Sequence, residues 1–185
     1  MSVTGALREI HLFPVKSAGG LSPQSAAVGP DGLVGDRSHA VVDAGGEVLA
    51  AKRTPRLREL QLGESLDAPR VLVPGGQDLA AFLGVTSAHV VPVAGGARQV
   101  EAVHVVTLAQ RADPAAGDTS RANLVLDVDA LLAPGTVLRI GTAVLEVVGL
   151  PRHCGGVFAR VATPGALRVG DVVDVVVEEG SGPPG

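Results

Sequence analysis

The sequence is poor in aromatic residues and in cysteine. Of its 185 residues none is Trp or Tyr, three are Phe and one is Cys. A single cysteine forms no internal disulfide, which fits a reducing compartment. So few aromatic rings offer little for stacking nucleobases, and the net charge of −4 lacks the basic surplus that nucleic-acid-binding proteins show. The composition therefore argues against nucleic acid as a partner.

Long hydrophobic runs are also missing. No uninterrupted apolar stretch approaches the roughly 20 residues of a membrane-spanning helix. The segment Met1–Arg8 lacks the basic region and apolar run of a signal peptide. P-loop, dinucleotide-binding, zinc-spacing and serine-elbow motifs do not occur, and the five histidines are scattered. We expect a cytoplasmic protein without a membrane partner.

The apolar residues that are present follow a β pattern. Short runs rich in valine recur about every ten residues, with glycine and proline between them, which predicts a barrel or a sandwich. Leu7–Val15 and Ala143–Val148 are examples of predicted strands, and Ser38–Asp43 with Glu47–Ala51 predicts a hairpin. Asp78–Gly84 predicts a short helix with Asp78 as N-cap and Gly84 as terminator. The fold class is mostly β, with a few short helices.

The glycine pair at residues 95–96 predicts the one internal boundary. It separates an N-terminal β region, residues 1–96, from a second β region, residues 97–177. The two form either separate domains or one compact unit, because 185 residues lie between one large domain and two small ones. Residues 178–185, rich in Gly, Pro, Ser and Glu, predict a flexible tail. The sequence does not indicate an oligomeric state.

The only cysteine, Cys154, is the first candidate for chemistry. Arg152 and His153 precede it, and Gly155 and Gly156 follow. Nearby cations lower the pKa of a thiol towards the reactive thiolate, and glycines leave room for a ligand to approach. In an extended segment Arg152 and Cys154 share a face, so Arg152 is the expected activating cation. The alternative is that Cys154 is a small, buried and inert side chain.

Polar residues at three other places are candidates for anion binding. A loop containing Lys16, Ser17 and two glycines can offer a cation and backbone N–H groups to an anion, or it is an ordinary turn. Arg37 follows Asp36 and a glycine, which suggests a constrained position. Arg121 and Asn123 lie on one face of an extended chain and can reach a single polar ligand.

The order of these motifs resembles the MOSC family, named for the C-terminal domain of molybdenum-cofactor sulfurase. Residues 13–17 (Phe-Pro-Val-Lys-Ser) look like the opening motif of the N-terminal β-barrel region of these proteins, here shortened. Residues 35–37 (Gly-Asp-Arg) and Arg53-x-Pro55 resemble its next two motifs. Residues 121–125 (Arg-Ala-Asn-Leu-Val) resemble the Arg-x-Asn segment of molybdenum-binding members. Cys154 falls where the family has its single invariant cysteine.

The resemblance implies a MOSC-type β-barrel and two chemistries for Cys154. Either this cysteine carries sulfur as a persulfide, with Arg152 assisting, or it coordinates molybdenum of the molybdenum cofactor (molybdopterin). The residues that would hold the pterin and its phosphate are Lys16, Ser17, Arg37, Arg121 and Asn123.

Three functions are compatible with these residues. The leading one is molybdenum cofactor or sulfur handling through Cys154, as a persulfide carrier or sulfurtransferase supplied by a cysteine desulfurase or another sulfur donor. The second is a molybdenum-dependent oxidoreductase that reduces N-hydroxylated compounds with electrons from separate electron-transfer proteins. A third, from a different class, is a non-catalytic β-barrel binding module.

Overall fold

The chain forms two compact units, and each is assembled from separated segments. The computed structural model describes residues 2–63, 65–66, 68–94 and 101–177. The barrel unit takes its described residues from Met1–Ile10, Pro23–Val34 and Glu101–Gly185. The second unit takes them from His11–Ser22 and Gly35–Val100. The first 100 residues therefore contribute to both units, whereas the predicted regions 1–96 and 97–177 follow the sequence; those limits stay a prediction.

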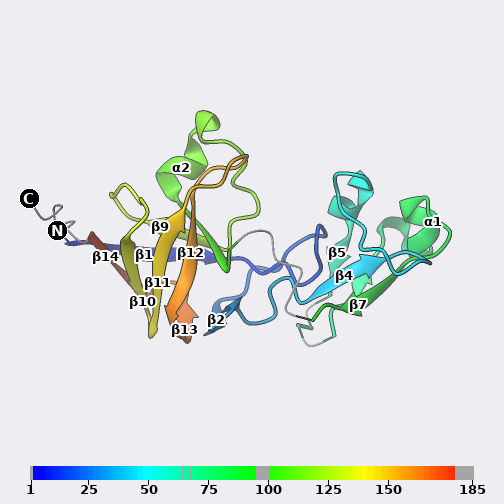
Figure 1. Ribbon diagram of the computed structural model, residues 1–185, viewed down its shortest axis with the longest axis horizontal. Coiled ribbons are helices and arrows are strands. Elements are labelled where there is room, and N and C mark those ends of the chain that lie inside the picture. Colours follow the sequence, from blue (N-terminus) through cyan, green and yellow to red (C-terminus); the bar gives the residue numbers. More distant parts are fainter. Residues whose placement is uncertain (1, 64, 67, 95–100, 178–185) are drawn as a thin grey trace, which may run out of the picture. The chain divides into compact units, whose positions relative to one another are not determined.

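A closed seven-stranded barrel is the centre of the barrel unit (Figure 1). Its strands follow one another around the wall in the order β1-β14-β10-β11-β12-β8-β9, and β9 pairs again with β1. Neighbours are antiparallel except β8 and β9, which are parallel. The strand bounds are β1 Ser2–Ile10, β8 Val103–Thr107, β9 Leu124–Asp127, β10 Thr136–Ile140, β11 Ala143–Gly149, β12 Val157–Thr163 and β14 Val172–Val177.

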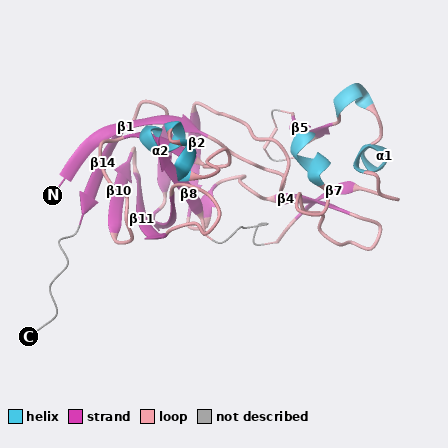
Figure 2. Cartoon of the chain, turned by 90° about the horizontal axis from the view of Figure 1, so that it is seen from above, coloured by secondary structure: helices cyan, strands magenta, loops and turns pink. Residues whose placement is uncertain are grey.

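The barrel interior follows from alternation along its strands. In β11 the buried residues are Ala143, Leu145 and Val147, with less buried residues between them, as expected when successive side chains point to opposite faces. Strand β8 is buried at every position. Its outer face is covered at Val106, which packs in a small cluster with Ala122 and Val125. The prediction of a mostly β barrel is confirmed, and Figure 2 shows how few helical turns accompany the strands.

Shorter elements complete the barrel unit. They are β2 Ser25–Gly29, β3 Gly32–Leu33, β13 Gly165–Arg168, α2 Leu108–Ala112 and η3 Pro114–Ala116. Strands β13, β2 and β3 form a separate small sheet, and α2 packs against β8 and β9. Helix α2 starts with a capping box, in which Thr107 and Gln110 each accept a hydrogen bond from the backbone N–H of the other. None of the helices in the described residues is long and apolar enough to cross a membrane.

The second unit has its own small core. Its elements are β4 His39–Val42, η1 Pro55–Glu59, β5 Gln61–Leu62, β6 Val71–Leu72, η2 Pro74–Gly76, α1 Leu79–Leu83 and β7 His89–Pro92. The buried cluster consists of Val15, Ala18, Val41, Leu57, Leu60, Phe82 and Leu83. The predicted helix is confirmed in detail, because Asp78 accepts a hydrogen bond from Ala81 N at 3.0 Å and Gly84 adopts a left-handed conformation.

Two predicted strands differ from the structure. The strand predicted over Leu7–Val15 ends at Ile10, since the chain passes from one unit to the other there and Leu12 pairs with Leu21 instead. In the predicted hairpin, β4 takes β7 as its main partner, and the second arm stays outside the named strands. The two arms are still joined, because Asp43 N donates to Glu47 O at 3.0 Å, Leu49 N donates to Val41 O at 2.8 Å, and Val42 bridges Val48. The boundary predicted at residues 95–96 and the tail at 178–185 lie outside the described residues.

Candidate functional site

Cys154 lies in a tight segment between β11 and β12, where the backbone is fixed by two neighbouring segments. Residue 154 forms a parallel bridge with Asp118, and Gly155 N donates a hydrogen bond to Asp118 O at 3.2 Å. Gly155 O lies 2.6 Å from Nε2 of His104 in β8. The loop after α2 and the loop after β11 therefore lie side by side at one end of the barrel (Figure 1). The thiol is half-buried in this arrangement.

The two glycines after Cys154 have a different role from the one expected. A Cβ on Gly155 would lie well inside 3.0 Å of Ala116 O, and one on Gly156 would do the same with Val105 O. Gly156 also has a φ of +88°, which side chains rarely adopt. Neighbouring backbone, rather than an incoming ligand, fills the space that we expected these glycines to leave open. They allow close packing of the turn around Cys154.

The electrostatic setting of Cys154 is opposite to the predicted one. Burial raises the pKa of the thiol, and the negative charge of Asp118 raises this pKa further. The chain bends at Arg152 and His153 rather than running extended, and both of these side chains are exposed. The extended segment from which the role of Arg152 was predicted is therefore replaced by a bend, and assistance of the thiolate by Arg152 stays a prediction.

Asn123 is built into the barrel next to this turn. It is 0% exposed; its Oδ1 accepts a hydrogen bond from His104 N at 3.0 Å, and its own N–H donates to His104 O at 2.7 Å. Asn123 thus extends the pairing of β8 with the start of β9. Arg121, two residues earlier, lies in a turn and is half-buried. Asn123 therefore holds the backbone of His104, whose ring contacts the Cys154 turn. Cofactor binding by Arg121 and Asn123 stays a prediction.

The remaining predicted residues lie together in the second unit. Lys16 N donates to His39 O at 2.9 Å, which sets the loop of Lys16 and Ser17 beside the segment that follows Arg37. Ser17 has a φ of 66°, and its Oγ accepts a hydrogen bond from Ala51 N at 3.2 Å. This bond explains the shape of the loop. An anion would share Ser17 Oγ with that backbone contact.

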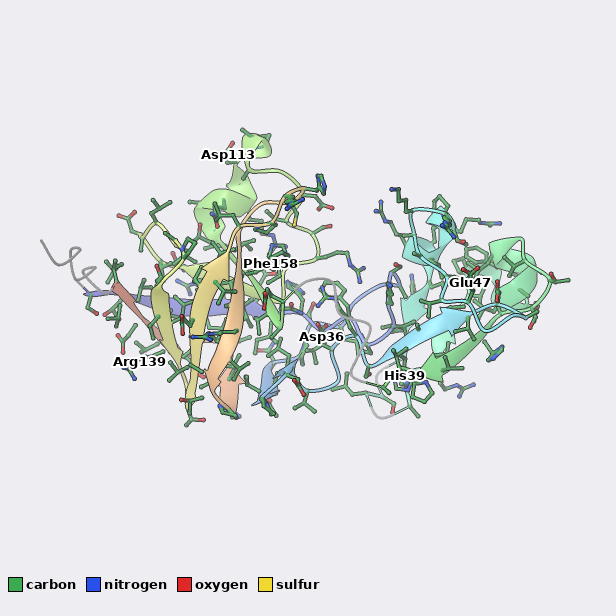
Figure 3. The ribbon with its side chains drawn as sticks, in the orientation of Figure 1. Asp36, His39, Glu47, Asp113, Arg139 and Phe158 are labelled. Carbon is green, nitrogen blue, oxygen red and sulfur yellow. The ribbon has the colours of Figure 1, made fainter. Side chains whose placement is uncertain are left out.

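Arg37 is a buried residue that is already engaged within its own unit. Only 8% of it is exposed, its N–H donates to Phe13 O at 2.9 Å, and its guanidinium lies 5.6 Å from the centre of the Phe13 ring. Asp36 (Figure 3) forms an ion pair with Arg37 and also accepts a hydrogen bond from Phe13 N at 2.7 Å. The predicted constrained position is confirmed by a φ of 51°. Because Asp36 offsets its charge, Arg37 has a clear structural role in addition to its predicted one.

Sequence reasoning missed two residues of the Cys154 turn. Asp118 lies in a predicted loop, and nothing in its spacing links it to residue 154. His104 stands alone in an apolar strand, which is typical of a buried histidine rather than of a ligand. The available signal is that a buried polar ring needs a hydrogen-bond partner, but the partner is a backbone carbonyl 51 positions away.

The sequence matches the profile of a known protein family. The profile of the MOSC N-terminal beta barrel domain matches residues 4–115, which is more than half of the sequence. The chain belongs to this MOSC family. The MOSC match ends before Arg121, Asn123 and Cys154, so the assignment of these residues depends on the motif resemblance.

A solved structure from Bacillus subtilis has a similar fold. The YuaD protein from Bacillus subtilis is similar over 95% of this chain and 97% of its own, with a TM-score of 0.50 and 12% sequence identity. No curated protein matches this MOSC chain significantly. MOSC proteins are generally associated with the molybdenum cofactor.

Proposed function

We propose that this protein handles the molybdenum cofactor through Cys154, the one ligand that the turn offers to molybdenum. The observation that supports this is the thiol itself, which is half-buried at one end of the barrel on a backbone fixed by Asp118 and His104. A soft sulfur ligand suits a soft metal centre. A single thiol can complete the coordination of a metal that brings its other ligands with it.

The raised pKa of Cys154 agrees with a ligand role. Metal binding releases the proton of a thiol, so a thiol that is protonated in the free protein can still become a thiolate ligand. Burial and Asp118 make this release harder, so we propose that binding tightens as pH rises. When bound, the cofactor would supply redox chemistry, and the protein would hold and orient it.

The anionic part of the cofactor needs cations, and the chain offers three predicted ones. Lys16 and Arg121 are half-buried, so their side chains reach solvent, whereas Arg37 is buried beside Asp36. We propose that Arg121, in the same unit as Cys154, attracts a phosphate there, and that Arg37 mainly shapes the Lys16 loop within the second unit. The motif resemblance implies the reaction class, and we propose reduction of N-hydroxylated compounds with electrons from a separate electron-transfer protein.

A second candidate function is sulfur transfer, which is favoured by the exposure of the turn. The neighbours Arg152 and His153 are exposed, and a donor protein can approach a half-buried thiol there. In this reaction the Cys154 thiolate attacks the outer sulfur of a donor persulfide, a new S–S bond forms, and the donor leaves as a thiolate. The attacking group must first lose its proton, and the raised pKa of Cys154 makes this step unfavourable at neutral pH.

Metal and pterin analysis tests the proposal. Protein purified from a host that makes the molybdenum cofactor should contain near-stoichiometric molybdenum and pterin, and Cys154→Ser should lose the molybdenum. His153→Ala, an exposed neighbour, is the matched control and should retain it. Metal-free wild-type protein from such a host would reject the proposal.

The same protein distinguishes the other functions. Incubation with a cysteine desulfurase and cysteine, followed by mass spectrometry, should add one sulfur to wild type and none to Cys154→Ser if the protein is a sulfur carrier. A protein with neither molybdenum nor added sulfur would be a non-catalytic binding module.

A further inference from the structure

His104 connects three segments around the Cys154 turn from a buried position. It is 3% exposed and lies in β8, where every residue is buried. Both of its backbone polar groups bond to Asn123. Its ring contacts that of Phe158 on β12, with the ring centres 5.3 Å apart, and its Nε2 reaches Gly155 O at 2.6 Å. Phe158 is labelled in Figure 3.

The hydrogen bond to Gly155 assigns a donor to the ring. A carbonyl oxygen only accepts, so Nε2 of His104 must carry hydrogen in this contact. Gly155 is buried, and its N–H is held by Asp118 O on the other side. Both peptide groups that follow Cys154 are therefore anchored, one by the Asp118 loop and one by the His104 ring. Without the ring donor, Gly155 O would be a buried acceptor lacking this partner.

We propose that His104 is the positioning residue that fixes Cys154 at the end of the barrel by holding the Gly155 carbonyl. The importance of His104 for function rests on the proposed role of Cys154. Its effect on the accessibility of the thiol can be measured whatever that role is. His104 acts through the backbone, and the close approach of Gly156 to Val105 and His104 leaves the turn little freedom.

Because the chain has one cysteine, alkylation of the thiol reports on this turn directly. Release of the Gly155 carbonyl should loosen the turn and make the half-buried thiol more accessible to a reagent. We expect His104→Leu, which removes the donor, to speed alkylation by iodoacetamide severalfold, because the turn opens more often. His104→Gln keeps an N–H donor at the end of a similar side chain and should restore the wild-type rate.

A destabilising control separates positioning from general loss of structure. Leu138→Ala removes a buried side chain from β10, a strand that pairs with β11 and β14. Among the hydrogen bonds of the described residues, none joins β10 to the Cys154 turn. Leu138→Ala should lower the melting temperature without changing the alkylation rate. The proposal would be overturned if His104→Leu were alkylated at the same rate as wild type, or at the same rate as His104→Gln.

NMR of the wild-type protein tests the same proposal if the Leu variant does not fold. With nitrogen-labelled histidine, the His104 ring should carry hydrogen on Nε2 at neutral pH, in slow exchange with water. A ring protonated only on Nδ1 would overturn it. These measurements use metal-free protein, so their failure would leave the molybdenum and sulfur assays unaffected, and negative assays would leave the positioning role intact.

Discussion

The sharpest structural prediction concerns Gly156, because two separate effects forbid a side chain there and a second glycine isolates one of them. Gly156 has a φ of +88°, and an added Cβ would lie well inside 3.0 Å of Val105 O and 2.5 Å from Val106 Cγ1. Gly135, in the same unit, has a φ of +89°, but an added Cβ there would meet nothing within 4 Å. Substitution of each by Ala therefore imposes similar backbone strain, and only one imposes a clash.

The expected costs follow from these two terms. A left-handed conformation costs an Ala about 1–2 kcal/mol. The loss of unfolded-state freedom returns about 0.4–1 kcal/mol. Gly135→Ala should therefore lower the free energy of unfolding by about 1 kcal/mol. Gly156→Ala adds an overpacking cost of about 1–3 kcal/mol, because Val105 is held by pairing with Val157 and Leu124 and cannot move away.

Urea unfolding followed by circular dichroism measures both variants on the same scale. We expect Gly156→Ala to be less stable than Gly135→Ala by about 1–3 kcal/mol, with faster alkylation of Cys154 in the folded protein. Surface substitutions ordinarily change the free energy of unfolding by no more than about 0.5 kcal/mol. If the free energies of unfolding of the two variants differ by no more than that, the turn is not tightly packed against β8.

Three further predictions test other contacts. Asp118→Asn removes a negative charge and should lower the pKa of Cys154, so that the rise in alkylation rate moves to lower pH; an unchanged or upward-shifted profile would contradict this. Asn123→Ala leaves the buried His104 N–H without its acceptor and should cost about 1–3 kcal/mol in urea unfolding, far more than an exposed substitution. Asp78→Ala removes the N-cap of α1 and should cost about 0.5–2 kcal/mol, whereas Asp78→Asn should preserve stability.

The sequence predicts local structure best where one residue type has one physical role. Asp78 and Gly84 mark the start and end of α1 because a capping carboxylate and a left-handed glycine act within a single turn. The short apolar run Ala143–Val148, which follows the turn residue Gly141, likewise predicts β11. The end of β1 at Ile10 is set instead by the passage of the chain into another unit, which no local pattern records.

The candidate site shows the same limit. Cys154 is singled out by being the only cysteine, and Arg37 by its neighbouring Asp and glycine. The setting of the thiol depends on Asp118, which is 36 positions away (154 − 118) and pairs with it through the backbone. Adjacent cations in sequence suggest a low pKa, but Arg152 points to solvent at a bend. Burial of Cys154 in the folded chain is the main cause that raises its pKa, and the charge of Asp118 adds to it.

The raised pKa of Cys154 also bears on which of its two proposed chemistries is easier. A sulfur carrier needs its thiolate before the donor arrives, because the nucleophile must attack a sulfur atom. A metal ligand needs its thiolate only on binding, when the metal itself displaces the proton. Burial and Asp118 hinder the first requirement in the free protein, whereas the second remains accessible at the cost of weaker binding at low pH. We therefore propose ligation ahead of nucleophilic attack as the role of Cys154, and Asp118→Asn should shift the balance towards attack.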